Sequence, residues 1–151
     1  MTVDCLMPID MMMSLNVLII DDDPIFVMMH KLKVKMSSIA DNPQTHHNGK
    51  SAWESITNNK DEDASFLLFL DINMPIMNGW DLLNELQRSP LSSKVYVALV
   101  TSSIDRMDKE RAKKYPQVIG FYEKALNVDT CIQIKNNPAI AHFFDSDSTL
   151  N

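Results

Sequence analysis

One apolar run that ends at a carboxylate constrains the fold of this chain more than any other feature. Residues 66–70 are Phe-Leu-Leu-Phe-Leu, and Asp71 follows directly. A short apolar run without polar alternation is typical of a strand that is buried on both faces, as in a parallel sheet. Asp71 would then lie at the carboxyl end of a strand, where open α/β sheets bind ligands. Asp71 is therefore a candidate nucleophile or metal ligand; the alternative is an ordinary Asp that begins a turn.

The same alternation of strand and helix repeats along the chain. Further strands are predicted at residues 17–20, 95–100 and 118–122, with a weaker signal at 44–47. Helices are predicted at residues 24–39, 49–59, 79–88, 104–115 and 127–134 from apolar residues at helical spacing and from breaks at Pro. Five strand-helix units in this order predict an α/β fold, a parallel sheet with helices on both faces.

Composition excludes several classes of protein. The 151 residues carry a net charge of −6, which argues against a nucleic-acid surface, and no stretch approaches the length of a membrane span. Two cysteines far apart in sequence indicate reduced thiols and a cytoplasmic protein. We expect a loosely ordered leader at residues 1–14, one domain at 15–136, and a C-terminal extension at 137–151 with a short helical turn and a frayed tail.

The four histidines show no spacing that is typical of a zinc site. His46 and His47 are adjacent, so in a strand they would point to opposite faces and could not share one metal ion. His30 and His142 are remote from them in sequence. We interpret all four as structural or surface residues.

Polar residues follow the strong predicted strands. They are Asp21 and Asp22, Asp71, Thr101 and Lys124. In a parallel sheet these ends meet at one edge, so three carboxylates, a hydroxyl and an ammonium would lie together. Such a set suits Mg²⁺, a carboxylate nucleophile that accepts a phosphoryl group, and a lysine that neutralises phosphoryl oxygens. The simpler alternative for Lys124 is an ion pair that neutralises the acidic edge, and the two roles are compatible.

The motifs around these residues resemble the receiver domain of two-component response regulators, of the CheY-like, stand-alone type. The resemblance spans about residues 15–134 and rests on residues 19–24 (Ile-Ile-Asp-Asp-Asp-Pro), 70–75 (Leu-Asp-Ile-Asn-Met-Pro) with 78–79 (Asn-Gly), 99–101 (Leu-Val-Thr) and 122–124 (Tyr-Glu-Lys). It implies a flavodoxin-like, doubly wound sheet with strand order 2-1-3-4-5.

The resemblance also implies a role for each matching residue at the acidic edge. Asp71 would accept a phosphoryl group from a sensor histidine kinase or a histidine phosphotransfer protein. Asp21, Asp22 and Asp71 would hold Mg²⁺ together with the backbone carbonyl of Asn73.

The remaining implied roles concern the conformational change that phosphorylation would cause. Thr101 would be the switch hydroxyl, Lys124 would contact the phosphoryl group, and Phe121 falls at the position of the switch aromatic. Phosphorylation would shift the face formed by the fourth helix, fifth strand and fifth helix. One departure is Ala125, because the family usually has Pro there, often after a cis peptide bond. A cis bond before a non-Pro residue is costly, so we expect this loop to differ in shape or mobility.

Four functions remain open at this point. The leading hypothesis is a phosphorylation-activated regulator, not an enzyme, that acts by binding an unknown downstream protein, with a homodimer left open. A phosphorelay intermediate or phosphate sink is a close alternative. A phosphatase of the haloacid dehalogenase type would need a second carboxylate where the chain has Asn73. A receiver-like module that is never phosphorylated is disfavoured by the complete set of site residues.

Overall fold

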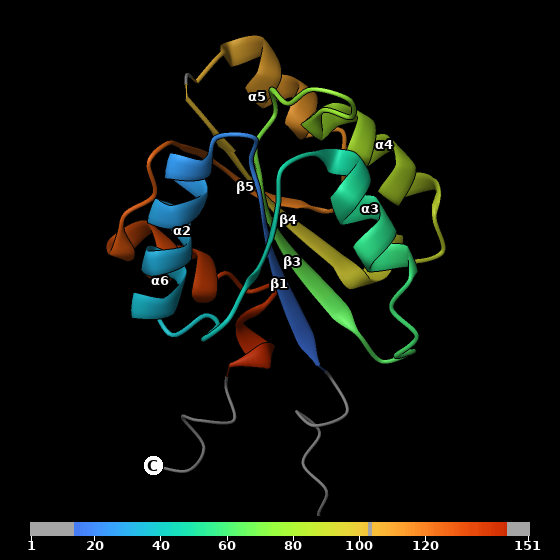
Figure 1. Cartoon of the computed structure of the whole chain (residues 1–151), viewed down its shortest axis with the longest axis horizontal. Helices are drawn as coiled ribbons and strands as arrows, with labels where there is room; N and C mark the ends of the chain where they lie inside the picture. The colour runs from blue at the N-terminus through green and yellow to red at the C-terminus, as the bar shows by residue number, and fades with distance from the viewer. Residues whose placement is uncertain (1–13, 103, 145–151) are drawn as a thin grey trace, which may run out of the picture.

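A computed structural model describes residues 14–102 and 104–144, which form a sheet between two layers of helices (Figure 1). The elements in chain order are β1 (Leu15–Ile20), α2 (Pro24–Met36), β2 (Gln44–His46), α3 (Gly49–Thr57), β3 (Ser65–Leu70), α4 (Gly79–Arg88), η2 (Ser92–Lys94), β4 (Val95–Thr101), α5 (Arg106–Ala112), β5 (Val118–Glu123), α6 (Val128–Lys135) and η3 (Ala141–Phe143). The five strands pair in parallel in the order β2-β1-β3-β4-β5. The predicted flavodoxin-like sheet is therefore confirmed, including the weakly indicated strand β2.

Alternate residues of the central strands divide the interior into two cores. Leu18 and Ile20 of β1 point into the core beneath α3, α4 and α5, while Val17 and Ile19 point into the core beneath α2 and α6. Figure 1 shows α2 and α6 side by side on one face of the sheet, with α3 and α4 on the other. Because β1 and β3 are buried on both faces, their sequences show no polar alternation.

The orientation of α2 differs from what its apolar spacing suggests. The helix begins as expected, with Asp23 accepting a hydrogen bond from the Ile25 N–H and with Pro24 at the first helical position. Its buried residues are Val27, His30 and Val34. Of the apolar residues at helical spacing that predicted the helix, Ile39 is buried but lies beyond the end of α2, and the others form its exposed face instead; they are Ile25, Met28, Met29, Leu32 and Met36, with exposed fractions of 39–72%.

Helix ends account for most other differences from the sequence-based prediction. The helix α2 ends at Met36, because Ser37 caps it and Ser38 has a positive φ of 63°. The helix α5 covers only residues 106–112 of the predicted 104–115. The predicted leader, except Ser14, and the predicted tail at 145–151 lie outside the described residues. Among the helices in the described part of the chain, none is long and apolar enough to cross a membrane.

Candidate functional site

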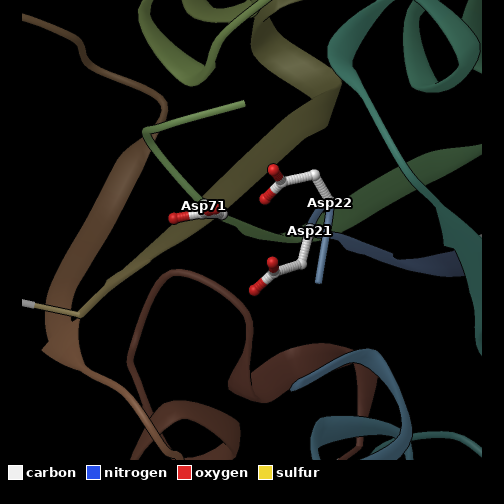
Figure 2. Close-up of side chains that lie close together, drawn as sticks. All are labelled: Asp21, Asp22 and Asp71. Carbon is white, nitrogen blue, oxygen red and sulfur yellow. The ribbon is translucent and has the colours of Figure 1, made fainter. Parts of the chain in front are cut away.

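Three carboxylates lie together at the carboxyl ends of β1 and β3 (Figure 2). Oxygen atoms of Asp21, Asp22 and Asp71 all lie within 4.8 Å of one another. The backbone fixes this arrangement, because the Asp71 N–H donates to the Ile20 carbonyl at 2.9 Å and thereby ties the two strand ends together. Asp21 and Asp71 are buried, whereas Asp22 is exposed, so the cluster opens to solvent on one side.

Lys124 reaches this cluster from the end of β5. Its Nζ lies 2.6 Å from Asp21 Oδ2 and 3.4 Å from Asp71 Oδ2, and its side chain is only 7% exposed. A buried ammonium needs such partners, and two buried carboxylates need a cation. Lys124 supplies one positive charge to two buried acids, so the buried part of the cluster keeps an excess negative charge.

The electrostatics of the site act most strongly on Asp71. Burial raises the pKa of its carboxyl group to about 6 from the ordinary 3.8, and repulsion by Asp21 adds to this effect. Lys124 and the backbone N–H of Asn73 lower the pKa, but they do not offset burial. A carboxyl group with a pKa of about 6 is half-ionised near pH 6, and only its ionised fraction can act as a nucleophile.

The donor atoms fit a magnesium ion. Mg²⁺ prefers oxygen ligands and binds through one or two carboxylates while it keeps waters and phosphate oxygens. Asp21, Asp22 and Asp71 offer one carboxylate oxygen each on one side of the sheet edge, and no histidine or cysteine belongs to this group. The excess negative charge of the cluster also favours a divalent cation.

The loop between β3 and α4 packs tightly against the backbone of Asp71. A Cβ atom at Gly79 would lie 2.6 Å from the Asp71 carbonyl oxygen and 2.9 Å from Ile72 Cα, so no other residue fits without moving the backbone. The Gly79 N–H donates to the Ile72 carbonyl at 2.8 Å. Asn78 then caps α4 through a reciprocal pair of hydrogen bonds with Asp81. The Asn-Gly pair of the sequence therefore fixes the loop that follows Asp71.

The other predicted site residues lie at the same edge or next to it. Thr101 is buried at the end of β4, and its carbonyl accepts the Lys124 N–H at 2.7 Å. Asn73 is exposed in the loop after Asp71. Phe121 lies in β5, half-buried against the core beneath α3, α4 and α5, and borders a surface groove with Ala112 of α5.

The loop after Lys124 corrects one expectation. The peptide bond between Lys124 and Ala125 is cis even though Ala125 is not proline. The loop therefore keeps the cis bond that the sequence argued against. Hydrogen bonds on both sides hold it, from the Lys124 N–H to Thr101 and from the Leu126 N–H to His30 Nε2 at 3.2 Å.

Sequence reasoning did not single out His30 and Phe26 as neighbours of the site. His30 is 2% exposed, and burial lowers the pKa of its imidazole to about 4, against the attraction of Asp21. The ring centroid of Phe26 lies 4.4 Å from Lys124 Nζ. No local sequence signal marks these contacts, because each joins α2 to a loop about a hundred residues later.

Comparisons with known proteins agree with this geometry. Residues 17–134 match the response regulator receiver domain. The two-component response regulator ARR22 of Arabidopsis thaliana is 31% identical over 138 residues, which cover 87% of this chain and 85% of that protein.

Solved structures show the same fold. A two-component response regulator from Cytophaga hutchinsonii superposes with a TM-score of 0.67 at 24% identity, covering 87% of this chain and 95% of that one. A response regulator receiver protein from Dyadobacter fermentans superposes with a TM-score of 0.72 at 16% identity, covering 87% and 98%. With a family match over most of its length, this chain belongs to the response regulator receiver domain family.

Proposed function

We propose that this protein is a phosphorylation-activated response regulator whose Asp71 accepts a phosphoryl group from a histidine kinase or a histidine phosphotransfer protein. The observation that carries the proposal is that the side chains of Asp21, Asp22, Asp71 and Lys124 lie close together at one sheet edge. The protein would act as a regulator in the cytoplasm rather than as an enzyme with its own substrate.

The transfer step follows from the side chains present. A carboxylate oxygen of Asp71 attacks the phosphorus atom, the bond from phosphorus to the donor nitrogen breaks, and that nitrogen keeps the electron pair. Lys124 Nζ, which already lies 3.4 Å from Asp71, faces the negative charge of the transferred oxygens. Asp21, Asp22 and Asp71 would hold Mg²⁺, with the Asn73 carbonyl as a further ligand. When bound, Mg²⁺ supplies positive charge that neutralises the phosphoryl oxygens.

The exposed apolar face of α2 supports a protein as the donor. The helix begins at Pro24, directly after Asp22 and Asp23, so its first turn borders the carboxylate cluster. A macromolecule that brings a phosphohistidine to Asp71 must cover the surface next to this pocket. Met28 and Leu32, which are 72% and 53% exposed, give such a donor an apolar surface to bury. Lys31, Lys33 and Lys35 on the same helix favour carboxylates on the donor.

The output would pass through α5, β5 and α6, which are the fourth helix, fifth strand and fifth helix of the domain. Lys124 and Thr101 are joined through their backbones, so a change at the phosphoryl group reaches the end of β4. Phe121 borders a groove between β5 and α5, where a change in its ring orientation would alter the surface offered to a downstream protein.

The test is intact-protein mass spectrometry after incubation with Mg²⁺ and acetyl phosphate. We expect one phosphoryl adduct in the wild-type protein and none in Asp71→Asn. Asp63→Asn serves as the control, because Asp63 is an exposed carboxylate outside the cluster and its loss should not change the adduct. An adduct that persists in Asp71→Asn would refute the assignment of the nucleophile. If neither acetyl phosphate nor phosphoramidate gives an adduct and no Mg²⁺ binds, the unphosphorylated module becomes the better interpretation.

A further inference from the structure

The helix α2 contacts the loop that carries Lys124 at two points. The ring of Phe26 lies against the ammonium group of Lys124, at 4.4 Å from centroid to Nζ. One turn later, His30 Nε2 accepts the backbone N–H of Leu126 at 3.2 Å. The two rings contact each other, with centroids 5.8 Å apart. One helix therefore contacts both the side chain of Lys124 and the backbone two residues beyond it.

The hydrogen bond from Leu126 to His30 is costly to lose. His30 and Leu126 are both 2% exposed, so neither the imidazole nor the amide can turn to solvent. A buried N–H that loses its acceptor costs about 1–3 kcal/mol. Since an N–H group only donates, Nε2 must be the unprotonated nitrogen, and the imidazole is neutral in this arrangement.

This bond completes a clamp around Lys124. On one side the Lys124 N–H donates to the Thr101 carbonyl of β4, and on the other the Leu126 N–H donates to His30 of α2. The backbone of residues 124–126 is thus held between the sheet and the helix. From that position Nζ reaches Asp21 at 2.6 Å and Asp71 at 3.4 Å.

We propose that His30 is a positioning residue for phosphoryl transfer, because by accepting the Leu126 N–H it holds Lys124 Nζ between Asp21 and Asp71. The inference rests on the proposed function and assigns to His30 a role that acts through Lys124. Transfer chemistry is sensitive to such placement, since a misplacement of about 1 Å can cost up to about a hundredfold in rate.

The test compares three variants by their initial rate of phosphorylation with acetyl phosphate and saturating Mg²⁺. His30→Leu keeps a buried side chain but removes the acceptor, and we expect the rate to fall at least about tenfold. His30→Gln restores an acceptor at a similar reach, and its rate should return to within about twofold of wild type. Val34→Ala removes buried volume from the same helix, one turn away, and should lower stability while leaving the rate of the folded protein unchanged.

A double-variant comparison separates positioning from general structure. If His30 acts through Lys124, then adding His30→Leu to Lys124→Ala should cause no further loss of rate. Losses that multiply, or a wild-type rate in His30→Leu, would overturn the inference.

A second measurement does not depend on phosphorylation, so it stays informative if the proposed function itself fails. Amide hydrogen exchange in His30→Leu should speed up at Lys124 and Leu126, while the amides of β1 and β3 keep their protection. His30→Gln should restore the protection of the Lys124 and Leu126 amides. If protection at these two amides is equal in His30→Leu and the wild-type protein, the clamp does not exist and the inference is wrong.

Discussion

Asp71 should lower the stability of the metal-free protein at neutral pH, and Asp71→Asn should remove this penalty. The pKa of Asp71 is raised to about 6 from 3.8 by burial and by Asp21. The folded protein therefore binds more protons than the unfolded chain between pH 3.8 and about 6, so its stability falls as the pH rises through this interval. At about 1.4 kcal/mol per pH unit, the charged carboxylate costs about 3 kcal/mol at pH 7 and above.

Urea unfolding in EDTA buffers at several pH values between 4 and 8 measures this effect. Trp80, which is 6% exposed, and the partly buried Trp53 provide the fluorescence signal. We expect Asp71→Asn to be more stable than the wild-type protein by up to about 3 kcal/mol at pH 8. The difference should shrink through pH 6 and nearly vanish by pH 4. Adding Mg²⁺ at pH 8 should also narrow this difference in stability, because the ion stabilises the wild-type protein, which keeps all three carboxylates, more than Asp71→Asn.

The control is Asp41→Asn, which changes an exposed carboxylate outside the cluster and should not affect stability by more than about 0.5 kcal/mol. Because all other titrating groups are common to both proteins, the difference between Asp71→Asn and wild type isolates the site. If Asp71→Asn is no more stable at pH 8, or if its advantage is the same at pH 4 and pH 8, the electrostatic reasoning is refuted.

Three further predictions follow from the same geometry. Gly79→Ala should destabilise the protein by about 2 kcal/mol or more in thermal or urea unfolding, because its Cβ would clash with the backbone of Asp71; an unchanged midpoint would contradict the close approach. Lys124→Met should raise the pKa of Asp71 above about 6, since Lys124 lowers it, and side-chain carboxyl NMR would show a titration shifted to higher pH; a pKa at or below the wild-type value would count against the ion pair. Asn78→Ala should cost about 1 kcal/mol in the same unfolding assays through loss of the α4 cap, whereas Gln87→Ala, at an exposed position of the same helix, should cost less than about 0.5 kcal/mol; equal losses would contradict the cap.

The arrangement of the site was predictable because chain connectivity determines it. Once the apolar runs are assigned to parallel strands, the residue after each strand must lie at one edge. Asp21, Asp71, Thr101 and Lys124 are brought there by sheet order alone. Neither their distances nor the pKa of Asp71 could be predicted, since both depend on how the side chains pack and how deeply they are buried.

The orientation of α2 could not be predicted for a physical reason. Both of its faces carry apolar side chains, for example Val27 and Val34 on one and Met28 and Leu32 on the other. Spacing identifies a helix, but it does not decide which of two apolar faces meets the sheet. The structure buries the two valines and exposes three methionines together with Ile25 and Leu32, and flexible methionine side chains suit a surface that adapts to a partner.

The unequal distances of Lys124 to its two carboxylates explain how the site could change state. Lys124 lies closer to Asp21 than to Asp71, so in this state it neutralises Asp21 more fully. A phosphoryl group on Asp71 would carry about two negative charges near neutral pH and would compete with Asp21 for the ammonium. Since the backbone N–H of Lys124 donates to the Thr101 carbonyl, we expect that competition to alter the backbone at the end of β4.

Amide chemical shifts of Thr101 and Lys124 should therefore change on phosphorylation in the wild-type protein. In Lys124→Met the change in the Thr101 amide chemical shift should be much smaller. An equal change would show that Lys124 does not couple the phosphoryl group on Asp71 to Thr101.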